Sequence, residues 1–135
     1  MTNQEKKEYL NQYLESKQRF YILAEEMNQL RSDAVRVTPV ITDMPSGPHV
    51  NDKIARAIEK LEQCANALEQ EARIMQHRMD EVKAAIDGLT NGTLKNLLLL
   101  RYIDDYTWEE IAVAMNYSYV HVCRLHGQAL SEIML

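Results

Sequence analysis

Hydrophobic residues recur at alternating steps of four and three residues through the first part of the chain. From about Asn3 to Val35 this repeat passes through Tyr9, Tyr13, Ser16, Phe20, Leu23, Met27, Leu30 and Ala34. Such steps average about 3.5 residues, the packing period of supercoiled helices, whereas a strand alternates at every second residue. The pattern therefore predicts one long helix with a narrow apolar stripe.

The same repeat returns in a second segment that runs from about Asp52 to Leu89, and no residue of its stripe is charged. Asn51 or Asp52 can cap the start of this helix, and Gly88 or Gly92 can end it in the left-handed conformation. Two long helices fold back most simply as an antiparallel hairpin, and a homodimer would bury more of both stripes. The seam of this hairpin or dimer is expected to contain Tyr13, Phe20, Leu23, Met27, Leu30, Ile54, Ile58, Leu61, Leu68, Met75, Met79, Val82 and Ile86.

A connection over residues 36–52 separates the two segments and contains Pro39, Pro45, Pro48 and Gly47. Proline lacks an amide donor and disfavours helical geometry at the residue before it, so one helix is not expected to continue through this stretch. The connection is longer than most loops in compact domains. A functional loop and a flexible linker both fit this stretch.

From Leu94 the pattern changes, because Leu97 to Leu100, Tyr102 and Ile103 are apolar on nearly every side of a helix. This predicts a buried helix, which Asp104 and Asp105 end. We therefore divide the chain into a helical hairpin over residues 1–89 and a second domain over residues 90–135.

Two capping signals then predict a pair of short helices. Thr107 and Glu110 form the T-x-x-E arrangement of a capping box, which starts a helix at Trp108. Ser118 can cap a further helix from Tyr119 to about Ile133, whose inward residues are Val122, Leu125, Ala129 and Ile133. A short helix, a tight turn and a second capped helix are typical of a helix-turn-helix in an all-α protein.

The string L-x-x-R-Y-x-x-x-x-T-W-E-E-I-A-x-x-M-x-Y-S-x-x-x-V-x-R-L-H-x-x-A-L, from Leu98 to Leu130, resembles region 4 of bacterial sigma factors. It is more similar still to small phage-encoded transcriptional regulators of the RinA and ArpU type. Their pattern also resembles this chain in having a long helical N-terminal part and a D-M-P stretch followed by glycine, here Asp43, Met44, Pro45 and Gly47.

The resemblance implies a regulator that binds double-stranded DNA, of phage or prophage genes, with RNA polymerase as a possible second partner. The helix from Tyr119 would be the recognition helix in the major groove. Its implied DNA-facing residues are Tyr119, Val120, Cys123 and Arg124, with His121, His126 and Gln128 as backbone contacts. Arg124 is the best candidate for base readout, since a guanidinium can bond guanine O6 and N7 together.

Charge favours an alternative to DNA binding. The whole chain carries 15 basic and 20 acidic residues, a net charge of −5, which is opposite to the usual footprint of a DNA-binding domain. Residues 90–135 alone hold three basic and five acidic residues, a net charge of −2. Because phosphate neutralisation supplies most non-specific affinity, a protein-interaction module without direct DNA contact is the competing interpretation.

Other chemistry finds little support in the sequence. Cys64 and Cys123 form no CxxC unit, which fits reduced thiols in the cytoplasm. On one helix, positions 121 and 123 point about 200° apart, so His121, Cys123 and His126 are not expected to hold a metal. No phosphate-binding glycine loop, apolar run of membrane-spanning length or secretory signal is found. We therefore expect a cytoplasmic protein with no catalytic residues, cofactor, metal or membrane association.

Overall fold

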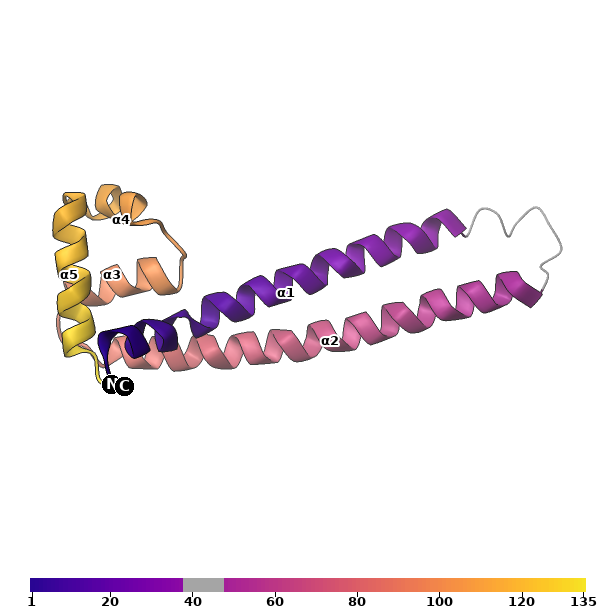
Figure 1. Cartoon of the computed structure of the whole chain (residues 1–135), viewed down its shortest axis with the longest axis horizontal. Helices are drawn as coiled ribbons and strands as arrows, with labels where there is room; N and C mark the ends of the chain where they lie inside the picture. Colours follow the sequence, from indigo (N-terminus) through magenta and orange to yellow (C-terminus); the bar gives the residue numbers. More distant parts are fainter. Residues whose placement is uncertain (38–47) are drawn as a thin grey trace. The chain divides into compact units, whose positions relative to one another are not determined.

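The computed structural model describes residues 1–37 and 48–135, and within these ranges the chain is all-helical. The helices are α1 (Asn3–Val37), α2 (Pro48–Asp87), α3 (Gly92–Tyr102), α4 (Trp108–Met115) and α5 (Tyr119–Glu132) (Figure 1). The all-α class predicted from the sequence is confirmed for the described residues. None of these helices is long and apolar enough to cross a membrane.

The chain divides into two compact units, and the division does not follow the predicted boundary between residues 89 and 90. One unit combines Met1–Lys17 with Ile74–Leu135, and the other is Gln18–Arg73. The reason lies in the core of the first unit, where Leu10 of α1 and Val82 and Ile86 of α2 pack in one cluster with the short helices. The ends of both long helices therefore belong with α3, α4 and α5.

The first unit holds the whole buried core of the described residues. Its fully buried side chains include Leu10, Ile86, Leu94, Leu97, Leu98, Ile111 and Leu130. Two long-range hydrogen bonds tie the helices together at its edge. The Lys6 ammonium donates to the Leu130 carbonyl at 2.6 Å, and the Arg78 guanidinium donates to the Ser16 hydroxyl at 2.9 Å.

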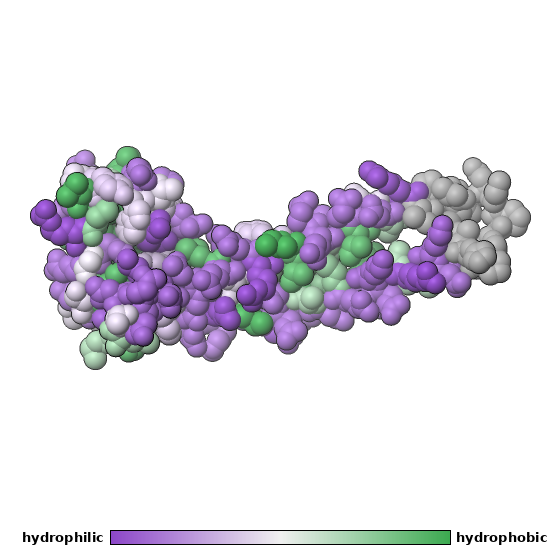
Figure 2. All heavy atoms as spheres, in the orientation of Figure 1, coloured by the Kyte–Doolittle hydropathy of each residue, from purple (hydrophilic) through white to green (hydrophobic). Residues whose placement is uncertain are grey.

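The second unit contains the later part of α1 and the earlier part of α2. No side chain in residues 18–36 or 52–73 is fully buried, because two helices alone leave one side of each stripe uncovered. Half-buried seam residues are Phe20, Leu23, Met27, Leu30, Ile54, Leu61 and Leu68. Ile58 was also expected in the seam of the hairpin or dimer, and 51% of its surface is exposed within one chain. Figure 2 shows hydrophobic residues, in green, at the surface along this helix pair.

The helix ends differ in part from those expected. α2 begins at Pro48, so Asn51 and Asp52 lie inside the helix and do not cap it. Proline fits this first position because its missing amide has no partner there in any helix. No described glycine has a positive φ, so neither Gly88 nor Gly92 forms the expected left-handed end. The rest of the proline-containing connection, including its D-M-P stretch, lies outside the described residues.

Candidate nucleic-acid interface

Local chemistry fixes where α4 and α5 begin, as the sequence predicts. The capping box is present, since the Glu110 amide donates to the Thr107 hydroxyl at 3.2 Å and the Thr107 amide to the Glu110 carboxylate at 3.3 Å. The Ser118 hydroxyl accepts from the His121 amide at 3.2 Å. Between the helices, Asn116 has φ 58° and ψ 45°, a left-handed conformation that asparagine tolerates better than most residues. This residue ends α4 three positions before α5 begins.

The first two turns of α5 present one exposed face. The side chains of Cys123 and Arg124 are exposed, as are 49% of Tyr119 and 64% of Val120. These are the four residues that the family resemblance implies as DNA-facing. Val122, Ala129 and Leu130 of α5, and Ile133 at its C-terminal end, are buried in the core.

His121 and Gln128 flank this face. His121 is half-buried, and its ring meets the Tyr117 ring edge-on with centroids 4.7 Å apart. Gln128 is exposed and its amide donates to the Glu132 carboxylate at 3.3 Å. Both side chains therefore have polar atoms near the surface.

His126 does not belong to the surface set, contrary to the sequence expectation. Only 7% of the residue is exposed, and its Nε2 atom lies 2.7 Å from the Tyr102 hydroxyl in a buried hydrogen bond. Burial first, and then the charges of Lys7 and Arg101, lower the pKa of His126 to about 4. A neutral, buried imidazole is part of the core rather than a contact for DNA. Its position on the helix, one turn from Val122 and Ala129, explains this placement.

The pKa values of two tyrosines are also shifted. Burial raises the pKa of Tyr102 to about 12, with Arg101 acting in the opposite direction. The electrostatic effect of the neighbouring Cys123 side chain raises the pKa of the Tyr119 hydroxyl above its usual value of 10.0. Both hydroxyls therefore keep their protons at neutral pH, and the exposed Tyr119 can donate a hydrogen bond to an external acceptor.

Beside His126, three side chains from three helices form a stack. The Arg101 guanidinium carbon lies 4.3 Å from the centre of the Trp108 ring, and one of its nitrogens donates to the Tyr106 carbonyl at 3.0 Å. The Trp108 ring in turn meets the His126 ring edge-on, with centroids 4.6 Å apart. Trp108 packs against the hydrophobic core, and the Arg101 guanidinium of α3 lies over its ring.

A cavity of about 400 Å³ opens next to this stack. Its lining consists of Lys7, Asn11, Arg101, Tyr102, Trp108, Cys123 and His126. It contains two cationic side chains and no carboxylate. Sequence reasoning missed this site, because Lys7 and Asn11 come from α1 while the other residues follow roughly one hundred positions later. Arg101, Tyr102 and Trp108 lie within the string from Leu98 to Leu130, but nothing in that string indicates Lys7 or Asn11.

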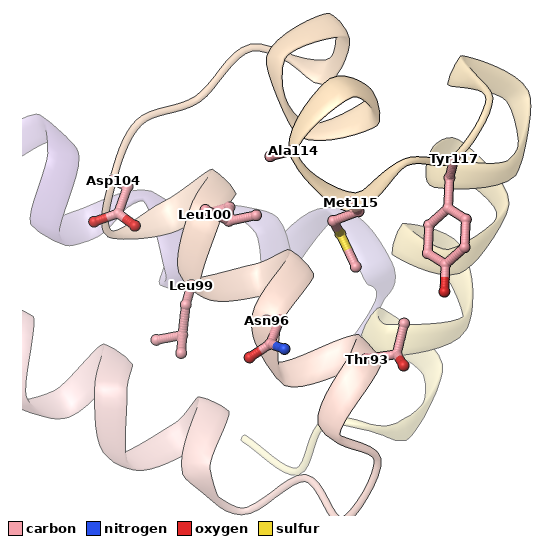
Figure 3. A pocket seen from close by; sticks show the side chains of 8 residues that line it. All are labelled: Thr93, Asn96, Leu99, Leu100, Asp104, Ala114, Met115 and Tyr117. Atoms are coloured by element: carbon pink, nitrogen blue, oxygen red, sulfur yellow. The ribbon is translucent and has the colours of Figure 1, made fainter.

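A second cavity, of about 540 Å³, lies between α3 and α4 (Figure 3). Leu99, Leu100 and Met115 supply its apolar surface, and Asp104 supplies its charge. Leu99 and Leu100 are half-buried, which corrects the expectation of a helix buried on every side. With a carboxylate and no cation, this cavity is electrostatically unlike the one beside Trp108.

Within residues 1–37 and 48–135, no three histidine, cysteine or carboxylate side chains gather as metal ligands do. Comparison with family models, with curated proteins and with solved structures gave no match.

Proposed function

We propose that this protein binds double-stranded DNA and is a sequence-specific regulator of the transcription of phage or prophage genes. In this proposal α4 and α5 form a helix-turn-helix similar to region 4 of sigma factors, and α5 is its recognition helix. The observation that carries the proposal is the exposed face of Tyr119, Val120, Cys123 and Arg124 on two capped turns of α5. The family-like string from Leu98 to Leu130, which contains these four residues, also supports it.

Each residue of this face suits a particular contact in the major groove. The Arg124 guanidinium can bond O6 and N7 of one guanine, and Val120 can pack on a thymine methyl group. The Tyr119 hydroxyl is a protonated donor for a phosphate oxygen or a base edge. His121 and Gln128 have the position and the donors for contacts to the DNA backbone.

The long helices complete the proposal as a coiled-coil-like antiparallel hairpin that forms a homodimer. Its support is the second unit, in which the seam residues are only half-buried and Ile22 and Ile58 are exposed. A dimer with two-fold symmetry would place two recognition helices at a fixed spacing and select a palindromic operator. The hairpin is also the surface on which RNA polymerase would dock in the cytoplasm.

Selection from a random duplex library tests the proposal directly. The full chain and its Arg124→Ala variant are each incubated with the library at low and physiological salt, and the retained DNA is sequenced. Arg19→Ala, which removes an exposed arginine of α1, serves as the matched control. We expect one enriched motif for the unmodified chain and for Arg19→Ala, and a loss of preference at a guanine position for Arg124→Ala.

The second candidate is a protein-interaction module in which α4 and α5 keep their fold without touching DNA. The net charge of −2 over residues 90–135 favours it, because a phosphate backbone repels an acidic surface. Sequence-specific duplex binding by the isolated chain at physiological salt excludes this candidate. A folded chain that enriches no sequence at either salt concentration excludes the DNA-binding proposal instead.

A further inference from the structure

The cavity beside Trp108 combines features that anion sites share. Its two cations, Lys7 from α1 and Arg101 from α3, converge on a space that no carboxylate lines. Neutral hydrogen-bonding groups complete the lining, among them the Asn11 amide and the Cys123 thiol. A volume of about 400 Å³ accommodates a tetrahedral oxyanion together with several waters, each of which takes about 30 Å³.

Arg101 is already oriented for such a ligand. The face of its guanidinium rests on the Trp108 ring, and one nitrogen is held by the Tyr106 carbonyl. The group is planar and carries five donors, so the donors not used by Tyr106 remain in a rigid fork that matches phosphate oxygens. Because the side chain is held in place before binding, little rotamer freedom is lost when an oxyanion arrives.

The positive potential in the cavity also acts on a neighbouring group. Besides burial, the charges of Lys7 and Arg101 lower the pKa of His126, which lines the same space. The field of both cations therefore reaches the interior of the cavity. An anion placed there would neutralise part of this positive potential. Its hydrogen bonds with Lys7 and Arg101 would be charge-assisted and therefore stronger than bonds between neutral groups.

The position of the cavity relates it to the exposed face of α5. Cys123 lines the cavity and also belongs to the face that contains Tyr119 and Arg124. A phosphate group in the cavity would therefore lie beside the residues that are proposed to read bases. Protein–DNA interfaces are built in this way, with phosphate contacts that position the recognition helix and base contacts that specify the sequence.

We propose that this cavity binds a phosphate group through Lys7 and Arg101. Its source is either a backbone phosphate of duplex DNA, which rests on the proposed function, or free phosphate. In the first case Lys7 supplies, from α1, a second cationic phosphate contact beside Arg101, which belongs to the acidic segment 90–135. Lys7 then anchors α5 on DNA of any sequence and has no part in base preference.

The test compares three variants of the full chain. Lys7→Gln removes the cavity's ammonium, and Lys7→Arg keeps the charge. Lys83→Gln removes an exposed lysine of α2 in the same compact unit and is the matched control. Lys7 is half-buried and lines the cavity. Far-UV circular dichroism establishes whether each variant retains its helices.

In the first arm, inorganic phosphate is titrated against chloride at equal ionic strength while the fluorescence of Trp108 is recorded. Trp108 lines the cavity and is the only tryptophan of the chain. In the second arm, the affinity for the selected duplex is measured over a range of salt concentrations. Losing one phosphate contact lowers the slope of log K against log salt by about 0.9.

We expect Lys7→Gln to lower this slope by about one phosphate contact for specific and unrelated duplexes alike, whereas Lys7→Arg and Lys83→Gln leave it unchanged. If the chain binds duplex DNA but Lys7→Gln changes neither the slope nor a phosphate response, the cavity proposal is wrong and the proposed function stands. A Lys7-dependent response to inorganic phosphate without any duplex binding supports a free-phosphate site and overturns the proposed function. The absence of both responses overturns both proposals.

Discussion

Acidification is expected to destabilise the first compact unit through a single buried histidine. His126 is neutral in the folded chain because its pKa is lowered from 6.5 to about 4 by burial, with smaller contributions from Lys7 and Arg101. Above pH 6.5 the histidine is neutral in both the folded and the unfolded chain, so it adds no pH dependence there. Below that pH His126 binds a proton in the unfolded chain but remains neutral in the folded chain. Stability is therefore lost as the pH falls from 6.5 toward 4.

The size of this loss follows from the shift. A change in pKa from 6.5 to about 4 corresponds to about 3 kcal/mol of unfolding free energy, at about 1.4 kcal/mol per pKa unit. Because His126 lines a cavity of about 400 Å³ and 7% of the residue is exposed, screening by solvent reduces the expected loss to about 2 kcal/mol. Since small domains have a net stability of about 5 to 15 kcal/mol, the effect is well within reach of denaturation experiments.

Urea denaturation at about pH 7 and about pH 4, followed through Trp108 fluorescence, measures this loss. The centroids of the Trp108 and His126 rings lie 4.6 Å apart, so the fluorescence reports on the first compact unit, to which both residues belong. His126→Gln is the control, because an amide can still bond the Tyr102 hydroxyl but does not titrate. Carboxylates elsewhere contribute equally to both proteins and cancel. If His126→Gln loses as much stability on acidification as the unmodified chain, the burial argument for His126 is refuted.

Three further predictions concern the core, a helix cap and the exposed stripe of α2. Leu98→Ala, at a fully buried position, should lower the unfolding free energy by about 2 to 5 kcal/mol in urea, and the half-buried Leu100→Ala should cost clearly less. Thr107→Ala removes the capping box and should cost about 1 kcal/mol in the same assay, whereas Thr107→Ser should retain most of the stability. Ile58→Glu should shift sedimentation toward the monomer without loss of helix signal if the exposed stripe of α2 is a dimer interface, and an unchanged sedimentation coefficient would contradict that assignment.

The features that sequence reasoning predicted correctly depend on neighbours along the chain. The Thr107 and Ser118 caps involve groups three residues apart, and such spacing identifies both partners directly. The two long helices likewise follow from a repeat that each segment contains by itself. The prediction of left-handed backbone was wrong, because Asn116 and Asp105 adopt this conformation and the described glycines do not.

What the sequence did not predict arises from contacts between distant segments. A four-three repeat predicts one partner for each helix, but the first turns of α1 have two, which is why Leu10 is buried although it lies beside the predicted stripe. The sequence placed His126 at the surface, but in the structure its buried hydrogen-bond partner is Tyr102, which comes from another helix. The cavity needs Lys7 beside Arg101, and no local pattern contains both residues.

The hydrogen bond from Lys6 to the Leu130 carbonyl spans 124 positions of the chain, and the first and last helices meet in one unit (Figure 1). This has a consequence for synthesis on the ribosome, where α1 emerges first and α5 last. The buried partners of Leu10 are not complete until α5 has left the exit tunnel, whereas Gln18–Arg73 can pair well before that. Closing so long a loop late makes assembly of the first unit the slow step. The face that carries Arg124 is therefore the last part of the molecule to mature, and no shortened chain that lacks α5 presents it.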